Sequence, residues 1–375
     1  MLSFITFFGL LLTATLLPVM ANATDVTVGA NWYGVKPDDL DPAIQEANLS
    51  AMQKAGIHSI RCGLNPDPPK LTDFLQRAKG HNIRVVWILS VQFPKGTRAP
   101  PPLKGFPWRN PGLSQADPKS FRDQFEPLFN RMDALRLPVA AFELDNEINW
   151  IGNGDFPVPG SGRLLTLQDL SVSPEGRKIA QGYLQYIKIL AVLKDLRDHS
   201  KVNRTTPILT AGMADSGSAA QPFRIAGQLV DSTDINTTLS YLRANGLDKL
   251  VDGYSVHHYP TSIKVGTKEG ADLRNSRMQN DVFTQCGSLG GGKPCWLTEW
   301  GFNIDSDVCP VNDTVRTSLV REVRSTFESL ARRGRLRGLF FFSWRDDSHA
   351  LHEDHSNIVR CGVVTDSGRL AIAPM

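Results

Sequence analysis

The stretch that decides the fold is FELDNEINW, residues 142–150, which follows the apolar run 137–141. The Val and Ala positions of that run, together with Phe142, leave no polar face, which is typical of a strand that is buried on both sides. The strand ends abruptly at Asn146 and Glu147, and Trp150 follows shortly after. An amide and a carboxylate at the mouth of a buried strand are costly to desolvate unless a site uses them. The stretch therefore predicts a functional site at the end of a strand.

A second stretch, KPCWLTEWG at residues 293–301, repeats this arrangement. It reads as a short apolar strand that ends in Glu299 beside Trp300. Two strand-end glutamates, Glu147 and Glu299, meet at one rim if both strands belong to a closed parallel barrel. Two carboxyl groups that face each other are the arrangement that glycoside hydrolysis requires.

Short apolar stretches alternate with helical patterns along the chain, as a (β/α)8 TIM barrel of the α/β class requires. We expect one barrel domain over residues 24–375, with long loops at 92–119 and 151–169 and a final helix that is short or missing. The expected strands lie at 26–32, 59–62, 83–91, 137–145, 207–211, 251–260, 293–299 and 339–344. The expected helices lie at 40–54, 71–79, 121–135, 174–199, 235–245 and 315–333, with a poorly defined one within 271–286.

The motifs at the strand ends resemble those of the clan A retaining glycoside hydrolases. They are Asn146-Glu147, the His257-x-Tyr259 pattern and the run TEWG at 298–301, in that order, each closing an apolar run. The resemblance covers nearly the whole chain after residue 23 and implies a (β/α)8 barrel. It further implies that Glu147 is the acid/base, that Glu299 is the nucleophile, and that β-glycosidic bonds are cleaved through a covalent glycosyl-enzyme.

The resemblance also assigns binding roles. Arg61 would keep the Glu299 carboxylate charged and oriented, Tyr259 would donate to it, and Asn146 would bind the sugar 2-hydroxyl. His257 would line the sugar site, and stacking at the cleavage subsite would fall to an aromatic residue after strand 8, Trp344. Sugar rings stack on indoles through their C–H faces, and further tryptophans follow or end the expected strands. These are Trp32, Trp150 and Trp300.

Some residues stay ambiguous at the level of sequence. Strand alternation places Glu143 and Asp145 on the same side as Glu147, so they compete for its role. Glu143 lies deeper and needs a partner that the sequence does not name. Trp108 fits sugar contact and the pinning of its own loop equally well. The sugar, the linkage and the choice between exo and endo action stay open.

Two rival functions remain. His349, His352 and His355 lie among acidic residues, which suggests a metal-dependent hydrolase on the same barrel. Their spacing does not match His-Glu-x-x-His, and a solvated loop is the simpler interpretation. The other rival is a non-catalytic carbohydrate-binding barrel, because fold alone does not imply activity. Both glutamates are intact, so we expect an enzyme that needs no metal or other cofactor.

Charge, the N-terminal stretch and the cysteines limit the binding partners and the cellular location that the sequence allows. The formal net charge is +3 and the charges are scattered, which argues against nucleic-acid or membrane partners. We expect a monomer that acts on a β-linked carbohydrate. Residues 1–23 read as a signal peptide, so we expect secretion. Of the five cysteines, Cys62 should be a buried free thiol, and the expected disulfides are Cys286–Cys295 and Cys309–Cys361.

Overall fold

The structure is a computed structural model that describes most of the chain. The described residues are 26–33, 36–103, 106, 109–215, 224–225, 227–287, 291–303, 309–344 and 357–375. The predicted signal peptide, Trp108 and the histidine-rich stretch around His352 lie outside the described residues. Within the described ranges, no helix combines the length and the apolar character needed to cross a bilayer.

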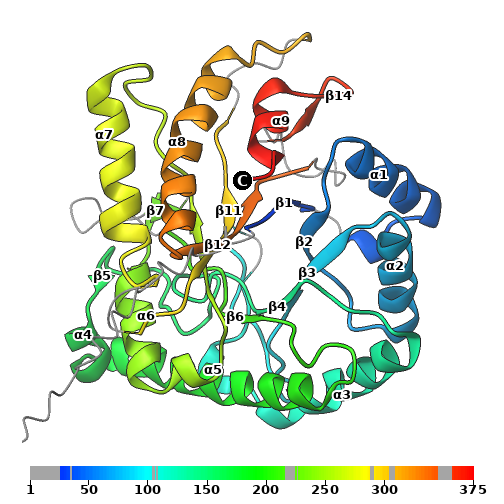
Figure 1. Cartoon of the computed structure of the whole chain (residues 1–375). Coiled ribbons are helices and arrows are strands. Elements are labelled where there is room, and N and C mark those ends of the chain that lie inside the picture. The colour runs from blue at the N-terminus through cyan, green and yellow to red at the C-terminus, as the bar shows by residue number, and fades with distance from the viewer. Residues whose placement is uncertain are drawn as a thin grey trace, which may run out of the picture.

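An eight-stranded parallel sheet forms the centre of the molecule, and the helices are arranged around it (Figure 1). The sheet order is β10-β11-β12-β1-β2-β3-β4-β6. Isolated parallel bridges, Leu209 to Gly253 and Met213 to Val256, join the two edges. The nearly closed sheet confirms the predicted (β/α)8 barrel. Its strands are β1 (Thr27–Asn31), β2 (Ser59–Gly63), β3 (Arg84–Leu89), β4 (Ala141–Leu144), β6 (Ile208–Leu209), β10 (Tyr254–His258), β11 (Cys295–Trp300) and β12 (Leu336–Phe341).

The surrounding helices follow the predicted order. A capping residue followed by proline begins four of them, at Asp41, Asp67, Asp117 and Ser173. Proline has no N–H to leave unpaired in the first turn, and the cap oxygen accepts from a backbone N–H of that turn. The helices are α1 (Pro42–Lys54), α2 (Pro68–Gly80), α3 (Pro118–Leu135), α5 (Pro174–His199), α6 (Ile235–Ala244), α7 (Lys268–Arg277), α8 (Thr314–Arg332) and α9 (Asp366–Ile372).

The irregular parts also match the expectation in outline. The final helix α9 is short, as predicted, and a π-helical turn, Met278–Val282, extends α7. The long loop after β3 contains a 3-10 turn, Leu113–Gln115. The long loop after β4 is more ordered than predicted, because it contains β5 (Leu164–Leu165) and α4 (Leu167–Val172). β5 pairs in parallel with β9 (Ser232–Thr233). Short hairpins are formed by β7 (Arg224–Ile225) with β8 (Gln228–Leu229) and by β13 (Val359–Arg360) with β14 (Val363–Val364).

A small apolar cluster fills the inside of the barrel. Its buried members are Val86, Ala141, Leu209, Trp296 and Phe340. The Trp296 ring stacks on Phe340, and a Cβ added at Gly338 would lie 2.2 Å from the Trp296 ring. Glycine at that position therefore makes room for the indole. Glu143 follows Ala141 by two residues on the same face of β4, so a polar layer begins toward the carboxyl ends of the strands.

The cysteines are arranged as predicted. Disulfides join Cys286 to Cys295 and Cys309 to Cys361. Cys62 is buried within β2 and is unbridged. The first disulfide ties the loop before β11 to the start of that strand, and the second ties the β13–β14 hairpin to the segment before α8.

Candidate active site

Arg61 of β2 is the centre of the polar layer. Its side chain is 2% exposed. Nε and Nη2 donate to the two carboxylate oxygens of Glu143 at 2.7 and 2.8 Å. Nη1 donates to Asn31 Oδ1 at 2.9 Å and to Glu299 Oε1 at 2.7 Å. The planar fork of a guanidinium suits such bidentate contacts, so Arg61 holds several carboxylate and amide oxygens in fixed positions.

Glu143 is the partner that balances Arg61 within the barrel. It is fully buried, and besides the two Arg61 contacts its Oε1 accepts from Ser255 Oγ at 3.0 Å. A buried carboxylate that is paired on both oxygens is an anchor, and it has no route to a substrate. Glu143 is therefore a structural partner of Arg61, and Glu147 is the better candidate for the acid/base role.

Glu299 lies near the carboxyl end of β11 and is 7% exposed. Arg61 contacts its Oε1, and the hydroxyl of Tyr259 donates to its Oε2 at 2.8 Å. Burial acts to raise the pKa of Glu299, but the neighbouring imidazole of His257, the positive charge of Arg61 and the hydrogen bonds from Tyr259 and Arg61 outweigh it. The pKa therefore falls below its ordinary value, and the carboxylate is held ionised.

Glu147 follows β4 in a backbone conformation that side chains rarely adopt. Asp145 and Glu147 have φ values of 68° and 49°, in the left-handed region. Such residues are strained unless their surroundings hold them. Here Glu147 N donates to Gly212 O at 2.8 Å, and Asp145 N donates to Leu89 O at 2.7 Å. These contacts fix the turn that directs the Glu147 side chain toward His257.

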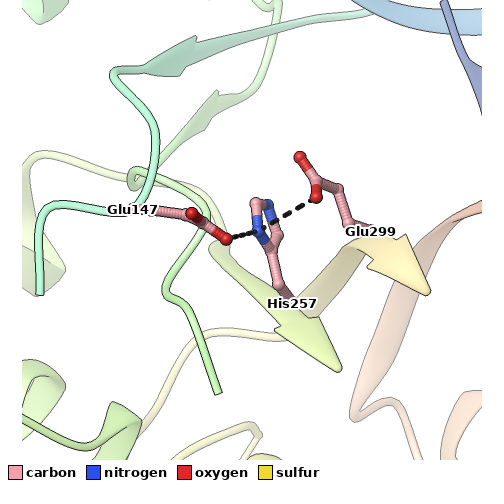
Figure 2. Close-up of side chains that lie close together, drawn as sticks. All are labelled: Glu147, His257 and Glu299. Atoms are coloured by element: carbon pink, nitrogen blue, oxygen red, sulfur yellow. Dashed lines mark hydrogen bonds and ion pairs between the residues drawn. The ribbon is translucent and has the colours of Figure 1, made fainter. Parts of the chain in front are cut away.

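His257 lies between the two glutamates (Figure 2). Its Nδ1 is 3.0 Å from Glu147 Oε1 and 3.4 Å from Glu299 Oε2, and its Nε2 is 3.3 Å from Arg61 Nη2. A guanidinium can only donate, so Nε2 accepts from Arg61 and Nδ1 carries the hydrogen. His257 therefore donates to Glu147, and Glu299 Oε2 lies close to the same nitrogen. The ligand atoms of Glu147, His257 and Glu299 all lie within 4.8 Å of one another.

Gly212 leaves the space that His257 occupies. A Cβ added at Gly212 would lie 2.0 Å from His257 Nε2, which is far inside van der Waals contact. The same glycine accepts from Glu147 N through its carbonyl. Gly212 is thus a part of the site that sequence reasoning missed. The run AGM at residues 211–213 contains no polar or aromatic residue that would indicate a site.

Two neighbours of Glu147 have distinct environments. Asn146 is exposed, and its Oδ1 accepts from Arg61 Nη2 at 2.6 Å, so its NH2 group points away from the guanidinium. Asp145 is buried, and its Oδ1 accepts from Asn146 N at 2.8 Å. Burial, aided by the nearby charge of Glu143, raises the pKa of Asp145 to about 7. Among the described residues, the Asp145 side chain hydrogen-bonds to Asn146 N and to neither Glu147 nor Glu299, so Glu147 is the better candidate for the acid/base role.

Three of the four predicted tryptophans do not line the cleft, which corrects the expectation for them. Trp300 is fully buried between Phe327 of α8 and Phe341, with ring centroids 5.0 and 4.9 Å away. Trp32 is buried and packs edge-on against Phe74 of α2. Trp344 is buried and donates from Nε1 to Asn48 Oδ1 of α1 at 3.1 Å.

Trp150 is the predicted tryptophan that does line a cavity beside Glu147. Its indole is half-buried and packs edge-on against Phe106 at 5.0 Å. This contact holds the ring in place while part of it stays accessible. Trp150 therefore offers an accessible apolar ring surface of the kind on which sugar rings can stack.

Sequence reasoning missed two aromatic residues near Tyr259, which are Phe342 and Tyr33. Phe342, the first residue after β12, is half-buried, and its ring lies 4.8 Å from the Tyr33 ring and 6.0 Å from the Tyr259 ring. Tyr33 and Tyr259 are 37% and 45% exposed. Phe342 directly follows β12, as the predicted tryptophans follow or end their strands. Phenylalanine is also common in protein cores, so this position alone does not indicate a binding residue.

The Glu147–His257–Glu299 group has the spacing of a metal site but not its electrostatics. Imidazole and carboxylate are suitable ligands, and their atoms are close enough together. However, Arg61 already contacts Glu299 Oε1 at 2.7 Å, Tyr259 donates to Oε2, and Nδ1 of His257 carries a hydrogen. A fixed guanidinium and protonated donors at these atoms do not fit a cation, so we derive no metal chemistry here.

The barrel is similar to those of solved glycoside hydrolases. A fungal β-1,4-galactanase gives a TM-score of 0.53 at 13% identity, over 92% of this chain and 94% of that chain. A GH5-4 broad-specificity endoglucanase from Clostridium acetobutylicum gives 0.54 at 12% identity, over 94% and 98%. A β-galactosidase from Marinomonas ef1 gives 0.53 at 13% identity, and the matched region is 58% of that longer chain.

Comparison with protein-family models and with curated proteins gives no match. The structural likeness confirms the predicted resemblance to clan A glycoside hydrolases at the level of the fold. At such low identities it says nothing further about activity. The function must therefore be argued from the residues of the site.

Proposed function

We propose that this protein is a retaining O-glycoside hydrolase that cleaves β-glycosidic bonds, with Glu299 as nucleophile and Glu147 as acid/base. The observation that carries the proposal is the spacing of the two carboxyl groups, whose nearest oxygens lie within 4.8 Å of each other. Retaining enzymes hold these groups about 5–5.5 Å apart, whereas inverting enzymes leave roughly 6.5–9.5 Å for a water molecule. Two carboxyl groups whose nearest oxygens are within 4.8 Å of each other support the retaining arrangement over the inverting one.

In the first step, Glu299 attacks the anomeric carbon while the bond to the leaving oxygen breaks. Arg61 and the Tyr259 hydroxyl keep Glu299 ionised and oriented for this attack. Glu147, in its protonated form, gives its proton to the leaving oxygen, so the leaving group departs as an alcohol. The product is a glycosyl ester on Glu299 and an ionised Glu147.

In the second step, Glu147 accepts a proton from water, and the oxygen of that water attacks the anomeric carbon. The ester bond breaks, and Glu299 leaves as a carboxylate that Arg61 again stabilises. His257 donates from Nδ1 toward Glu147, which keeps the carboxyl group directed at the same side of the sugar in both steps. Two displacements return the original β configuration.

The substrate contacts follow from the same geometry. The NH2 group of Asn146 is the donor available for the sugar 2-hydroxyl, because its amide oxygen is held by Arg61. Phe342 with Tyr33 offers an aromatic surface on one side of the glutamates, and Trp150 offers another beside Glu147. The two disulfides and the predicted signal peptide support secretion into an oxidising compartment.

The proposal is tested by the configuration of the first product. Aryl β-glycosides of several sugars should be screened, and the accepted one followed by proton NMR at early times. We expect the β anomer to form first and to mutarotate later. An α product at early times contradicts the retaining mechanism. Binding without turnover of any substrate supports the carbohydrate-binding alternative, and loss of activity with a chelator supports the metal-dependent one.

A further inference from the structure

A cavity of about 230 Å³ opens beside Glu147. Besides Glu147 it is lined by Trp150, Asp215, His257, Tyr259 and Arg277, while Glu299, Arg61 and Phe342 do not line it. At about 30 Å³ for each water molecule, the space holds roughly seven or eight waters, which is the scale of one sugar ring. The cavity therefore has room for a single ring.

The position of the cavity identifies which part of a substrate would enter it. In the proposed mechanism, the acid/base contacts the oxygen of the leaving group, and the nucleophile contacts the anomeric carbon of the sugar that becomes attached. A space that borders Glu147 and not Glu299 lies on the side of the leaving group. The half-buried indole of Trp150 supplies an apolar wall there.

The opposite side of the cavity carries a hydrogen-bonded chain of polar groups. Arg277, the last residue of α7, donates from Nη2 to Asp215 Oδ1 at 2.8 Å. Asp215 Oδ2 lies 2.8 Å from Nδ1 of the buried His258. The Arg277 side chain keeps 38% of its area exposed, although its Nε is buried and has no hydrogen-bond partner among the described residues. Asp215 therefore holds one side of the guanidinium, and the remaining N–H groups of Nη1 and Nη2 are the donors left for a ligand.

The charges around the cavity decide what kind of group fits it. Burial acts to raise the pKa of Asp215, but the hydrogen bonds with His258 and Arg277 and the charge of Arg277 outweigh it and hold that carboxylate ionised. The ionised Asp215 compensates the charge of Arg277, so the pair is neutral overall. Glu147 adds a negative charge whenever it is ionised. An anionic ligand gains no net electrostatic stabilisation in this cavity, whereas the hydroxyl groups of a sugar can accept hydrogen bonds from Arg277.

We infer that this cavity binds the uncharged leaving-group sugar of a β-linked oligosaccharide, with Arg277 as a specificity-determining residue. The inference rests on the proposed function and adds the substrate class to it. The enzyme then acts on a bond between two sugars, and a leaving group without hydroxyls forfeits the contact with Arg277. The loss of that contact should affect only substrates whose leaving group occupies the cavity.

The test compares two substrates of the same donor sugar. One is a neutral β-linked trisaccharide, chosen from gluco-, galacto- and manno-configured compounds, and the other is the β-glycosyl fluoride, whose leaving atom does not fill the cavity. Arg277→Met should lower kcat/KM for the trisaccharide by about tenfold or more, as expected for a lost contact to a charged donor. It should change the rate with the fluoride by less than about threefold.

The matched control is Lys268→Met, which removes a positive charge from the exposed start of the same helix. It should leave both rates unchanged, and Arg277→Lys should restore part of the trisaccharide rate. Equal losses for both substrates, no loss for the trisaccharide, or a preference for a uronic acid as the leaving group would overturn the inference. Failure of the wild-type enzyme to hydrolyse the fluoride would instead count against the proposed function.

Discussion

Arg61 Nη1 lies 2.7 Å from Glu299 Oε1, although 238 residues separate them in the chain. The same guanidinium makes a bidentate pair with Glu143 two strands away from β2. Through Arg61, the position of Glu299, the proposed nucleophile, is therefore tied to a carboxylate that is fully buried inside the barrel. The fold and the site share one set of hydrogen bonds.

Arg61→Lys should lower the activity and the stability of the protein together. A lysine ammonium cannot reproduce the fork that contacts Glu143 and Glu299, so Glu143 stays buried with fewer partners. We expect kcat/KM to fall by on the order of a hundredfold and the free energy of unfolding by on the order of 3 kcal/mol. Activity assays and urea unfolding measure the two effects. Arg122→Lys, in an exposed pair with Asp195, is the control and should change neither.

Asp145→Asn should change how stability depends on pH. The folded protein holds the pKa of Asp145 at about 7, above its ordinary value of 3.8, so it binds this proton more tightly than the unfolded chain does. That contribution is present at low pH and is lost as the pH rises from about 4 to about 7. Over this range, the unfolding free energy of the native protein should fall relative to the variant by on the order of 2–4 kcal/mol. Parallel curves for the two proteins would show that Asp145 is not the titrating group.

Gly212→Ala should displace His257. The added methyl group would lie 2.0 Å from His257 Nε2, where the imidazole cannot stay. We expect a loss of activity on the order of a hundredfold, because the hydrogen bonds of His257 to Arg61 and Glu147 break together. Gly63→Ala, at a position with nothing within 4 Å, is the control. A fully active Gly212→Ala enzyme would mean that His257 has no part in turnover.

The aromatic residues near the site should separate into two kinds. Phe342→Ala removes a half-exposed ring beside Tyr259 and should raise KM or lower kcat by about tenfold or more while stability changes little. Trp344→Ala removes a buried indole and should lower the unfolding free energy by about 3–5 kcal/mol. Kinetics and thermal unfolding of both variants test the assignment, and the reverse pattern would restore Trp344 as the stacking residue.

Apolar periodicity was enough to predict the barrel. The helix predicted at 174–199 has the observed bounds of α5, and its Ser-Pro start is a clear signal. The starts of α2 and α3 were predicted three residues late, because the Asp-Pro pairs at Asp67 and Asp117 were not used. The ordered parts of the loop after β4 were missed, since they are only a few residues long and depend on pairing with a distant segment.

The errors at the site have a common cause. A residue at the end of a strand lies near the carboxyl-terminal face of the barrel. The alternation of side chains along the strand then decides whether that residue faces the inside of the barrel or the helices. Glu299 faces the inside, so Trp300 must face α8, and it does. Glu143 and Arg61 could not be paired from sequence because their contact depends on strand register and on the length of both side chains.

The most direct test of the account is to trap the covalent intermediate. In a 2-deoxy-2-fluoro-β-glycosyl fluoride of the accepted sugar, the electron-withdrawing fluorine at C2 slows both steps by destabilising the oxocarbenium-like transition states. The fluoride at the anomeric carbon is a good leaving group and offsets this in the first step only, so the glycosyl-enzyme accumulates. The account predicts that mass spectrometry will find one fluorosugar per protein, attached to Glu299, and no adduct on Glu299→Ala. A stable label on Glu147 would contradict the account. So would an enzyme that forms no adduct with the fluorosugar and releases an α product from the unmodified substrate.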